Sequence, residues 1–259
     1  MPGRSTRSCR VGIVERLSTG ESFSPAKPSS AGAYTQPYPW RFTLESRTNY
    51  WEWTFSGESP NHRYLVPEIV HALKELPEGR ILDIGCGNGA VAGKIASAGF
   101  DVTGIDFTSS GIDRARRSFP TLQFLDHDIN EPLPEDLRGR FDVVLSAEVI
   151  EHLFFPRTLF TRTREALGSE GHIILSTPFH GYFKNLVMAV TGKFDHHWQV
   201  GSDFGHIKFF SQRSLGAMAS ECGFDPIFWG RGGRLRPLAA TMVMTGKMDP
   251  NFAPGDSSI

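Results

Sequence analysis

Short apolar runs alternate with amphipathic segments along most of the chain. The runs have the length of buried strands. They fall at 80–84, 101–106, 121–125, 141–146, 171–176, 224–229 and 238–245. Apolar residues at helical spacing predict helices at 64–76, 88–98, 109–118, 156–167 and 211–222. Strands that alternate with helices in this way predict the α/β class, with a doubly wound, Rossmann-like sheet and helices on both of its faces.

The same pattern suggests how the chain is divided. Residues 1–36 lack apolar periodicity and are expected to form a disordered leader, followed by an aromatic N-terminal cap and helix at 37–78. The main domain is expected at 79–250, and 251–259 form a tail. Within the domain, 177–210 is long for a connection, and it carries eight aromatic residues and four of the nine histidines. We interpret this insertion as a lid over the acceptor site.

Composition narrows the choice of partners. The net charge is −1 and no basic stripe is present, so a nucleic-acid substrate is not expected and a small-molecule acceptor is favoured. No apolar stretch approaches the roughly 20 residues that cross a bilayer, which argues against stable membrane insertion. The three cysteines, Cys9, Cys86 and Cys222, are widely spaced, as expected for a protein of the reducing cytoplasm.

The most informative segment is the junction between the first predicted strand and its helix. The strand carries Asp83 near its end, and Gly85, Gly87 and Gly89 follow at alternate positions. Glycines at such a point allow a sharp turn and the close approach of a ligand to the main chain. Asp106 ends the next strand, where an acid is placed to bind the ribose of a nucleoside. The ligand is therefore expected to be a nucleoside.

Two nucleoside ligands fit these glycines. Gly85, Gly87 and Ala90 also satisfy the dinucleotide pattern G-x-G-x-x-A, so an NAD-dependent oxidoreductase is an alternative. Asp83 favours the other choice, because a carboxylate there would repel a pyrophosphate but attract the ammonium of an amino acid. The chain also lacks the Tyr-x-x-x-Lys pair of many oxidoreductases. A catalytically silent protein that only binds the ligand is a third possibility.

Two further strand ends complete an ordered set of motifs. Asp128 and Ile129 follow the third strand, and Ser146 and Ala147 follow the fourth. Together with the glycine junction, this set resembles the class I S-adenosylmethionine-dependent methyltransferases. The resemblance covers roughly residues 60–245. It implies a seven-stranded, mainly parallel sheet whose last strand is antiparallel, with S-adenosyl-L-methionine as methyl donor and S-adenosyl-L-homocysteine (SAH) as product.

The resemblance also assigns roles around the donor. Asp83 and the glycine turn, in which Cys86 stands between two glycines, would frame the methionine part. Asp106 would bind the ribose. Phe107, Asp128 and Ile129 would meet the adenine, while Ser146 and Ala147 would contribute main-chain contacts near the sulfur. Arg63 would reach the carboxylate of the donor.

Within this class the chain looks most similar to ubiquinone-biosynthesis O-methyltransferases and to related bacterial small-molecule methyltransferases. The likeness lies in His62-Arg63, in Glu148-x-x-Glu151-His152 and in an insertion after the fifth strand. In that family the E-x-x-E-H pattern is assigned to a divalent metal, which implies Glu148, Glu151 and His152 as ligands of an ion such as Mg²⁺. On a helix these side chains would share one face. The insertion departs from the quinone enzymes, so their substrate is not carried over.

The expected reaction moves a methyl group to an oxygen, with nitrogen or carbon less favoured, of an aromatic or hydrophobic small molecule. A phenolic acceptor must lose a proton, and a histidine has a suitable pKa for removing it. His152, His180 and His206 are the candidate bases. The sequence leaves the choice among them, the acceptor and the oligomeric state open.

Overall fold

The computed structural model describes residues 61–194, 205–233 and 238–252, and its first element is the helix α2 (His62–Lys74). The expected leader and the aromatic segment up to residue 60 lie outside the described residues, as do the middle of the expected lid and the end of the tail. The other helices are α3 (Ala90–Ser97), α4 (Ser109–Ser118), α5 (Arg157–Ala166), α6 (Tyr182–Thr191) and α8 (Gln212–Glu221), with short 3-10 helices η1 (Glu135–Leu137) and η2 (Ile150–His152).

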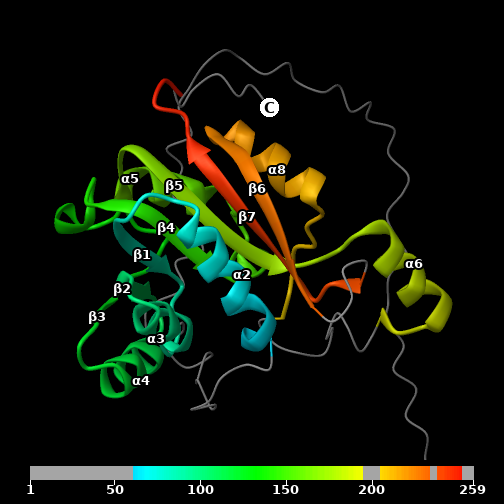
Figure 1. Cartoon of the computed structure of the whole chain (residues 1–259), viewed down its shortest axis with the longest axis horizontal. Coiled ribbons are helices and arrows are strands. Elements are labelled where there is room, and N and C mark those ends of the chain that lie inside the picture. Colours follow the sequence, from blue (N-terminus) through cyan, green and yellow to red (C-terminus); the bar gives the residue numbers. More distant parts are fainter. Residues whose placement is uncertain (1–60, 195–204, 234–237, 253–259) are drawn as a thin grey trace, which may run out of the picture. The chain divides into compact units, whose positions relative to one another are not determined.

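A seven-stranded sheet forms the centre of the described structure (Figure 1). Its strands are β1 (Arg80–Ile84), β2 (Asp101–Asp106), β3 (Gln123–Asp126), β4 (Phe141–Ala147), β5 (Leu167–Pro178), β6 (Phe224–Gly232) and β7 (Thr241–Met248). They lie in the order β3-β2-β1-β4-β5-β7-β6. Pairs among β1 to β5 are parallel, and β7 runs antiparallel to both β5 and β6. The predicted fold, with an antiparallel last strand, is confirmed.

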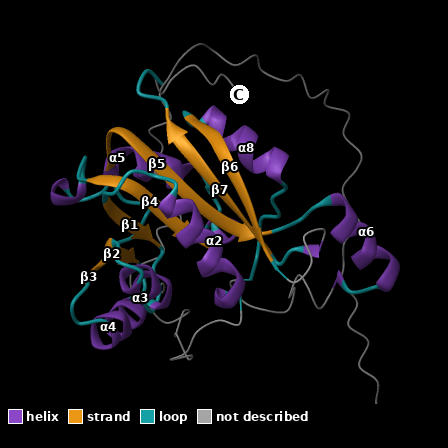
Figure 2. Ribbon diagram, in the orientation of Figure 1, coloured by secondary structure: helices purple, strands orange, loops and turns teal. Residues whose placement is uncertain are grey.

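Helices cover both faces of the sheet (Figure 2). One buried cluster joins α5 and α8 to strand residues such as Val144, whereas the other joins α2, α3 and α4 to the adjacent Val143 and Leu145. Successive side chains of a strand point to opposite faces. A strand buried on both faces therefore has apolar residues at consecutive positions, which explains the apolar runs in the sequence.

The structure differs from the expected elements in two places. The segment after β4 forms η2 rather than a turn of α-helix, so the prediction that Glu148, Glu151 and His152 share a helix face is wrong. Glu148 precedes η2 with a positive φ of 56°, a conformation that α-helices exclude. In addition, β5 continues to Pro178, and α6 lies inside the expected lid.

In the described parts of the chain, no helix combines the length and apolar character needed to cross a bilayer.

Candidate active site

The glycine junction forms a turn tied to the end of β2. Gly85, Gly87 and Gly89 all have positive φ, from 53° to 80°. The amides of Gly85 and Cys86 donate to the carbonyl of Ile105 at 2.8 and 3.0 Å, and the amide of Gly87 donates to a carboxylate oxygen of Asp106 at 2.9 Å. These bonds hold the loop between β1 and α3 open along the carboxyl edge of the sheet, where ligands bind in doubly wound folds.

Asp83 lies beside this turn and is almost fully buried, with 1% of its surface exposed. Neither of its carboxylate oxygens has a hydrogen-bond partner within the described structure. Burial, together with the negative charge of Asp106, raises the pKa of Asp83 from 3.8 to about 7. A buried carboxyl group without a partner is costly, and a cationic ligand would supply the missing partner.

A cavity of about 60 Å³ lies at Asp83. Its lining consists of His62, Asp83, Gly85, Cys86, Asn88, Val91 and Ala147. Gly85 packs closely on the segment after β4, because a Cβ atom at that position would stand 2.5 Å from Cγ2 of Val149. The residues present therefore fit the amino-acid end of the methyl donor, since a buried carboxylate faces a cavity whose wall is partly main chain.

Asp106 is also buried, and its oxygens already accept three hydrogen bonds. They come from the amide of Gly87 and from the amide and hydroxyl of Thr108. Burial raises the pKa of Asp106, whereas these hydrogen bonds lower it. A carboxylate has about four acceptor sites, so one site remains for a ribose hydroxyl. Asp106 thus orders the glycine turn as well as standing at the expected ribose position.

The side chains expected around the adenine lie near the ends of β2 and β3. Phe107 is 38% exposed, and Asp128 and Ile129 are half-buried. One carboxylate oxygen of Asp128 accepts hydrogen bonds from the amide and side chain of Asn130. Their contact with an adenine stays a prediction.

The residues expected near the sulfur have different roles in the structure. The Ser146 hydroxyl donates to the carbonyl of Ile84 at 2.9 Å, which ties β4 to β1. Ala147 lines the cavity. Arg63 is exposed, its guanidinium lies 4.5 Å from the centre of the Tyr64 ring, and it is not among the cavity-lining residues. Its contact with the donor carboxylate stays a prediction.

Three cavity residues were not predicted as site residues from the sequence: His62, Asn88 and Val91. The helical spacing held a signal for the first of them. His62 precedes the buried Leu65 by three residues and Ile69 by seven, so it lies on the inward face of α2. Arg63 is the next residue along the helix, so it lies off that inward face and is exposed.

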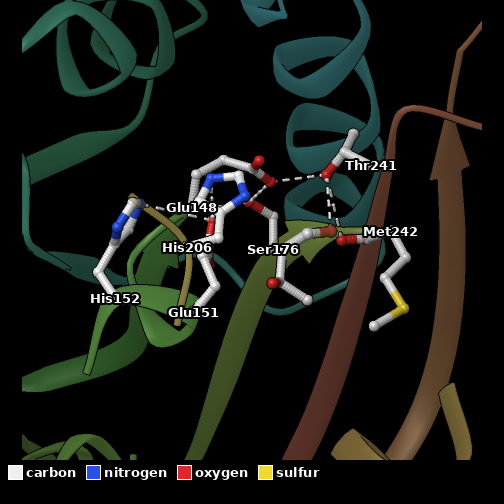
Figure 3. Close-up of polar contacts among 8 residues, drawn as sticks. Glu148, Glu151, His152, Ser176, His206, Thr241 and Met242 are labelled. Atoms are coloured by element: carbon white, nitrogen blue, oxygen red, sulfur yellow. Dashed lines mark hydrogen bonds and ion pairs between the residues drawn. The ribbon is translucent and has the colours of Figure 1, made fainter. Parts of the chain in front are cut away.

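A second group of polar side chains lies just beyond the cavity, where β4 and β5 end and β7 begins. Glu148 accepts hydrogen bonds from the hydroxyl of Ser176 at 2.9 Å and from that of Thr241 at 2.7 Å (Figure 3). Burial raises the pKa of Glu148, while these hydroxyls and the charge of Lys184 lower it. The Lys184 ammonium donates to the carbonyl of Ala239 at 3.1 Å. Glu148 therefore fastens strand ends to one another.

Glu151 faces two of the three candidate histidines instead. Its Oε1 atom lies 4.0 Å from Nε2 of His152 and 3.9 Å from Nε2 of His206 (Figure 3). The two imidazole rings meet edge to face, with centroids 4.9 Å apart. His180 is buried in another contact, edge to face with Phe209 at 5.1 Å. The structure thus brings together Glu151, His152 and His206, which we call the Glu-His-His group. Glu148 is absent from it, contrary to the expected ligand set.

We expect the affinity for SAH to fall as the pH drops below about 7. Binding the ammonium requires ionised Asp83, and its pKa of about 7 means that acidification protonates it in the free protein. At higher pH the amino group of the ligand loses its own proton, so the affinity should also fall there and should reach its maximum above pH 7. Calorimetric titrations from pH 5.5 to 9 would check this, and a flat profile below pH 7 would contradict it.

The glycine turn, the two strand-end acids and the order of the sheet define the class of Rossmann-like S-adenosylmethionine-dependent methyltransferases. A family model described as "Methyltransferase domain" matches residues 51–227, and the chain belongs to this family. The predicted family of the chain is confirmed.

Curated relatives and solved structures agree with this assignment. A ubiquinone biosynthesis O-methyltransferase of Cereibacter sphaeroides is 34% identical over 57% of this chain, which spans only 61% of that relative. One from Hydrogenovibrio crunogenus is 26% identical over 79% of this chain and 86% of the relative. The structure of magnesium protoporphyrin IX methyltransferase from Synechocystis, with bound SAH, aligns with a TM-score of 0.53 at 17% identity, covering 71% of this chain and 82% of that chain. The structural likeness shows the fold.

Proposed function

We propose that the chain transfers a methyl group from S-adenosylmethionine to an oxygen of an aromatic or hydrophobic small molecule. The observation that carries this proposal is the buried, unpaired carboxylate of Asp83 at a cavity beside the glycine turn. An amino-acid ammonium satisfies that carboxylate, whereas the pyrophosphate of NAD would be repelled by it. Family membership points the same way, so the oxidoreductase alternative has no support.

The donor supplies a methyl group already activated on a sulfonium, so the protein mainly has to position the reactants and exclude water. Asp83 would hold the ammonium at one end, and Asp106 would hold the ribose at the other. The glycine turn between them keeps the main chain close to the donor. Ala147, at the end of β4, lies in the wall of the same cavity.

Oxygen is favoured as the accepting atom for two reasons. The relatives described above are named O-methyltransferases. Glu151 and His152 of the Glu-His-His group also lie only a few residues beyond Ala147, where the group could receive an acidic hydroxyl. We propose that this group, rather than His180, meets the acceptor. His180 is buried, with 7% of its surface exposed, and its ring packs against Phe209, which suits a packing role.

Two measurements test the proposal. Calorimetry should detect binding of SAH but not of NAD. Incubation with a methyl-labelled donor and a panel of phenols, catechols, amines and carboxylic acids should then transfer label to one of the hydroxyl compounds. Binding of SAH without transfer to any acceptor would favour the catalytically silent alternative. Absence of SAH binding by folded protein would refute both.

Replacements of the three candidate histidines are expected to lower kcat by different amounts. Replacing His152 or His206 with alanine should lower kcat by about 10²- to 10⁴-fold, the usual contribution of a site that promotes removal of a proton. His180→Ala should lower it by less than about 10-fold. SAH affinity should be nearly unchanged in all three variants, because none of these residues lines the cavity. A larger loss in His180→Ala than in the other two would contradict the assignment.

A further inference from the structure

The Glu-His-His group has distances that do not suit hydrogen bonds. An imidazole N–H bonded to a carboxylate lies about 2.7–3.2 Å from it. Here both Nε2 atoms lie 3.9–4.0 Å from Oε1 of Glu151. Glu151 is fully buried, and neither of its oxygens makes a hydrogen bond of ordinary geometry with the described residues. A buried carboxylate therefore faces two imidazoles across a gap.

The gap has approximately the size of a metal ion. Zinc binds nitrogen and carboxylate oxygen at about 2.0–2.2 Å, so two of its ligand atoms lie roughly 3–4 Å apart. The ligand atoms of Glu151, His152 and His206 all lie within 4.8 Å of one another. Closing around an ion would require these side chains to move inward by roughly half an ångström. A buried, unpaired carboxylate gains most from such a cation.

The backbone fixes the group in place. Glu151 and His152 both belong to η2. His206 comes from the last part of the expected lid, and the amides of Ile207 and Lys208 that follow it both donate to the carbonyl of Glu151 at 3.0 Å. Two segments far apart in the sequence are thus joined beside the three side chains. The two histidines are partly exposed, with 27% and 31% of their side-chain surfaces accessible, which gives an ion a route from solvent.

We propose that Glu151, His152 and His206 bind a single divalent transition-metal ion of the zinc class. The donor atoms decide the kind of ion, since imidazole suits zinc and its neighbours, whereas Mg²⁺ prefers oxygen ligands and keeps several waters. The ligand set Glu148, Glu151 and His152 does not fit, because the carboxylate of Glu148 is held by Ser176 and Thr241. His206 takes its place.

The position of this site suggests its use. Val149 contacts the glycine turn, and Ala147 lines the cavity, so the ligands Glu151 and His152 follow the donor site within a few residues. Three protein ligands leave a position open on a tetrahedral ion, as in catalytic zinc sites. An acceptor hydroxyl bound there would lose its proton more readily, and the proton would pass to solvent water. This use rests on the proposed function, whereas binding of the ion does not.

Metal titrations of the full-length, untagged and chelator-treated protein test the site. Competition with a chromogenic indicator should show one zinc ion per chain, held at least 100-fold more tightly than Mg²⁺. In His206→Ala and His152→Ala, zinc affinity should fall by more than the roughly 10- to 100-fold that loss of an outer hydrogen-bond partner costs. Cobalt bound to the unmodified protein should show the visible spectrum of a four- or five-coordinate ion.

Two variants serve as controls. His71→Ala removes a histidine of α2 that packs against Phe228, and it should leave zinc affinity unchanged. Glu148→Gln should also retain zinc. SAH affinity measured on the same samples reports folding and the donor site separately, so failure of the metal site can be distinguished from failure of the proposed function. The proposal is overturned if no zinc binds, if His206→Ala binds it as His71→Ala does, or if Mg²⁺ binds more tightly and is lost in Glu148→Gln.

Discussion

Replacing Asp83 with asparagine is expected to weaken SAH binding by about 10- to 100-fold and, at the same time, to make the free protein more stable at neutral pH. The loss of affinity follows from removing a charge-assisted hydrogen bond to the ligand ammonium, worth about 1.5–3 kcal/mol. The asparagine has nearly the same shape and fits the same space. Calorimetry with SAH at pH 7.5 measures the affinity.

The gain in stability follows from the raised pKa of Asp83. Its pKa is about 7 in the folded protein and near 3.8 in the unfolded chain, so the unfolded chain ionises first as the pH rises. Asp83 therefore lowers the free energy of unfolding progressively between about pH 4 and pH 7, by up to roughly 4 kcal/mol. Below pH 4 both states are protonated and the cost disappears. Asparagine cannot ionise, although its buried amide retains part of the penalty of an unpaired polar group.

Urea unfolding of Asp83→Asn and the unmodified protein at several pH values would measure this difference. The two stabilities should converge near pH 4–5 and separate towards pH 8, with the variant more stable. Asp113→Asn is the matched control, because Asp113 is exposed on α4 and its change should alter neither property appreciably. Equal stabilities at pH 8 would contradict the raised pKa of Asp83, and unchanged SAH affinity would show that Asp83 is not the ammonium-binding carboxylate.

The sheet and the donor side of the site were predictable because both depend on local sequence. Strands buried on both faces give continuous apolar runs, and β1 and β2 match the expected ranges to the residue. The glycine turn and the acid that ends β2 are likewise local features of two β–α junctions. Asp83 and Gly85 line the cavity, and their contact with the donor stays a prediction.

The acceptor side was harder to predict because its contacts join distant parts of the chain. The conformation of Glu148 suits hydroxyl groups 28 and 93 residues away, on β5 and β7. The place of His206 depends on backbone bonds between 207–208 and Glu151. The spacing of residues along the chain carries no information about such long-range contacts. The E-x-x-E-H spacing therefore suggested a helix face, which the chain does not form.

Helix α6 was missed for a different reason. Its most exposed residues include Tyr182, Phe183 and Val190, whereas Lys184 is buried. Met188 is buried beside Lys184, but the exposed aromatic residues and the buried lysine depart from the usual amphipathic pattern, in which the apolar side chains face the core. A prediction based on burying apolar residues therefore finds only a weak signal for a helix in this segment.

Replacing Gly85 with alanine is expected to cost about 2–5 kcal/mol of stability and to weaken SAH binding. A left-handed conformation costs an alanine about 1–2 kcal/mol, and Gly85 has a φ of 80°. The new Cβ would also stand 2.5 Å from Cγ2 and 3.1 Å from Cγ1 of Val149, an overlap that costs about 1–3 kcal/mol. Urea unfolding and calorimetry with SAH measure the two effects.

A second replacement separates the two causes. Val149→Ala removes both overlapping methyl groups and leaves a Cβ atom 3.4 Å away, which is an ordinary contact. The double variant should therefore be more stable than the sum of the single changes predicts, by about 1–3 kcal/mol. Gly139→Ala is the matched control for backbone strain, because Gly139 has a φ of 62° and open space where its Cβ would lie.

Strict additivity of Gly85→Ala and Val149→Ala would mean that the turn relaxes away from Val149, and the close packing of the donor turn on the segment after β4 would then be refuted. A loss in Gly85→Ala no larger than in Gly139→Ala would lead to the same conclusion. The expected coupling, by contrast, would show that the main chain at Gly85 and the side chain of Val149 fix each other's position. Because Glu151 and His152 follow Val149 within three residues, that contact would also fix the spacing between the methyl donor and the groups proposed to meet the acceptor.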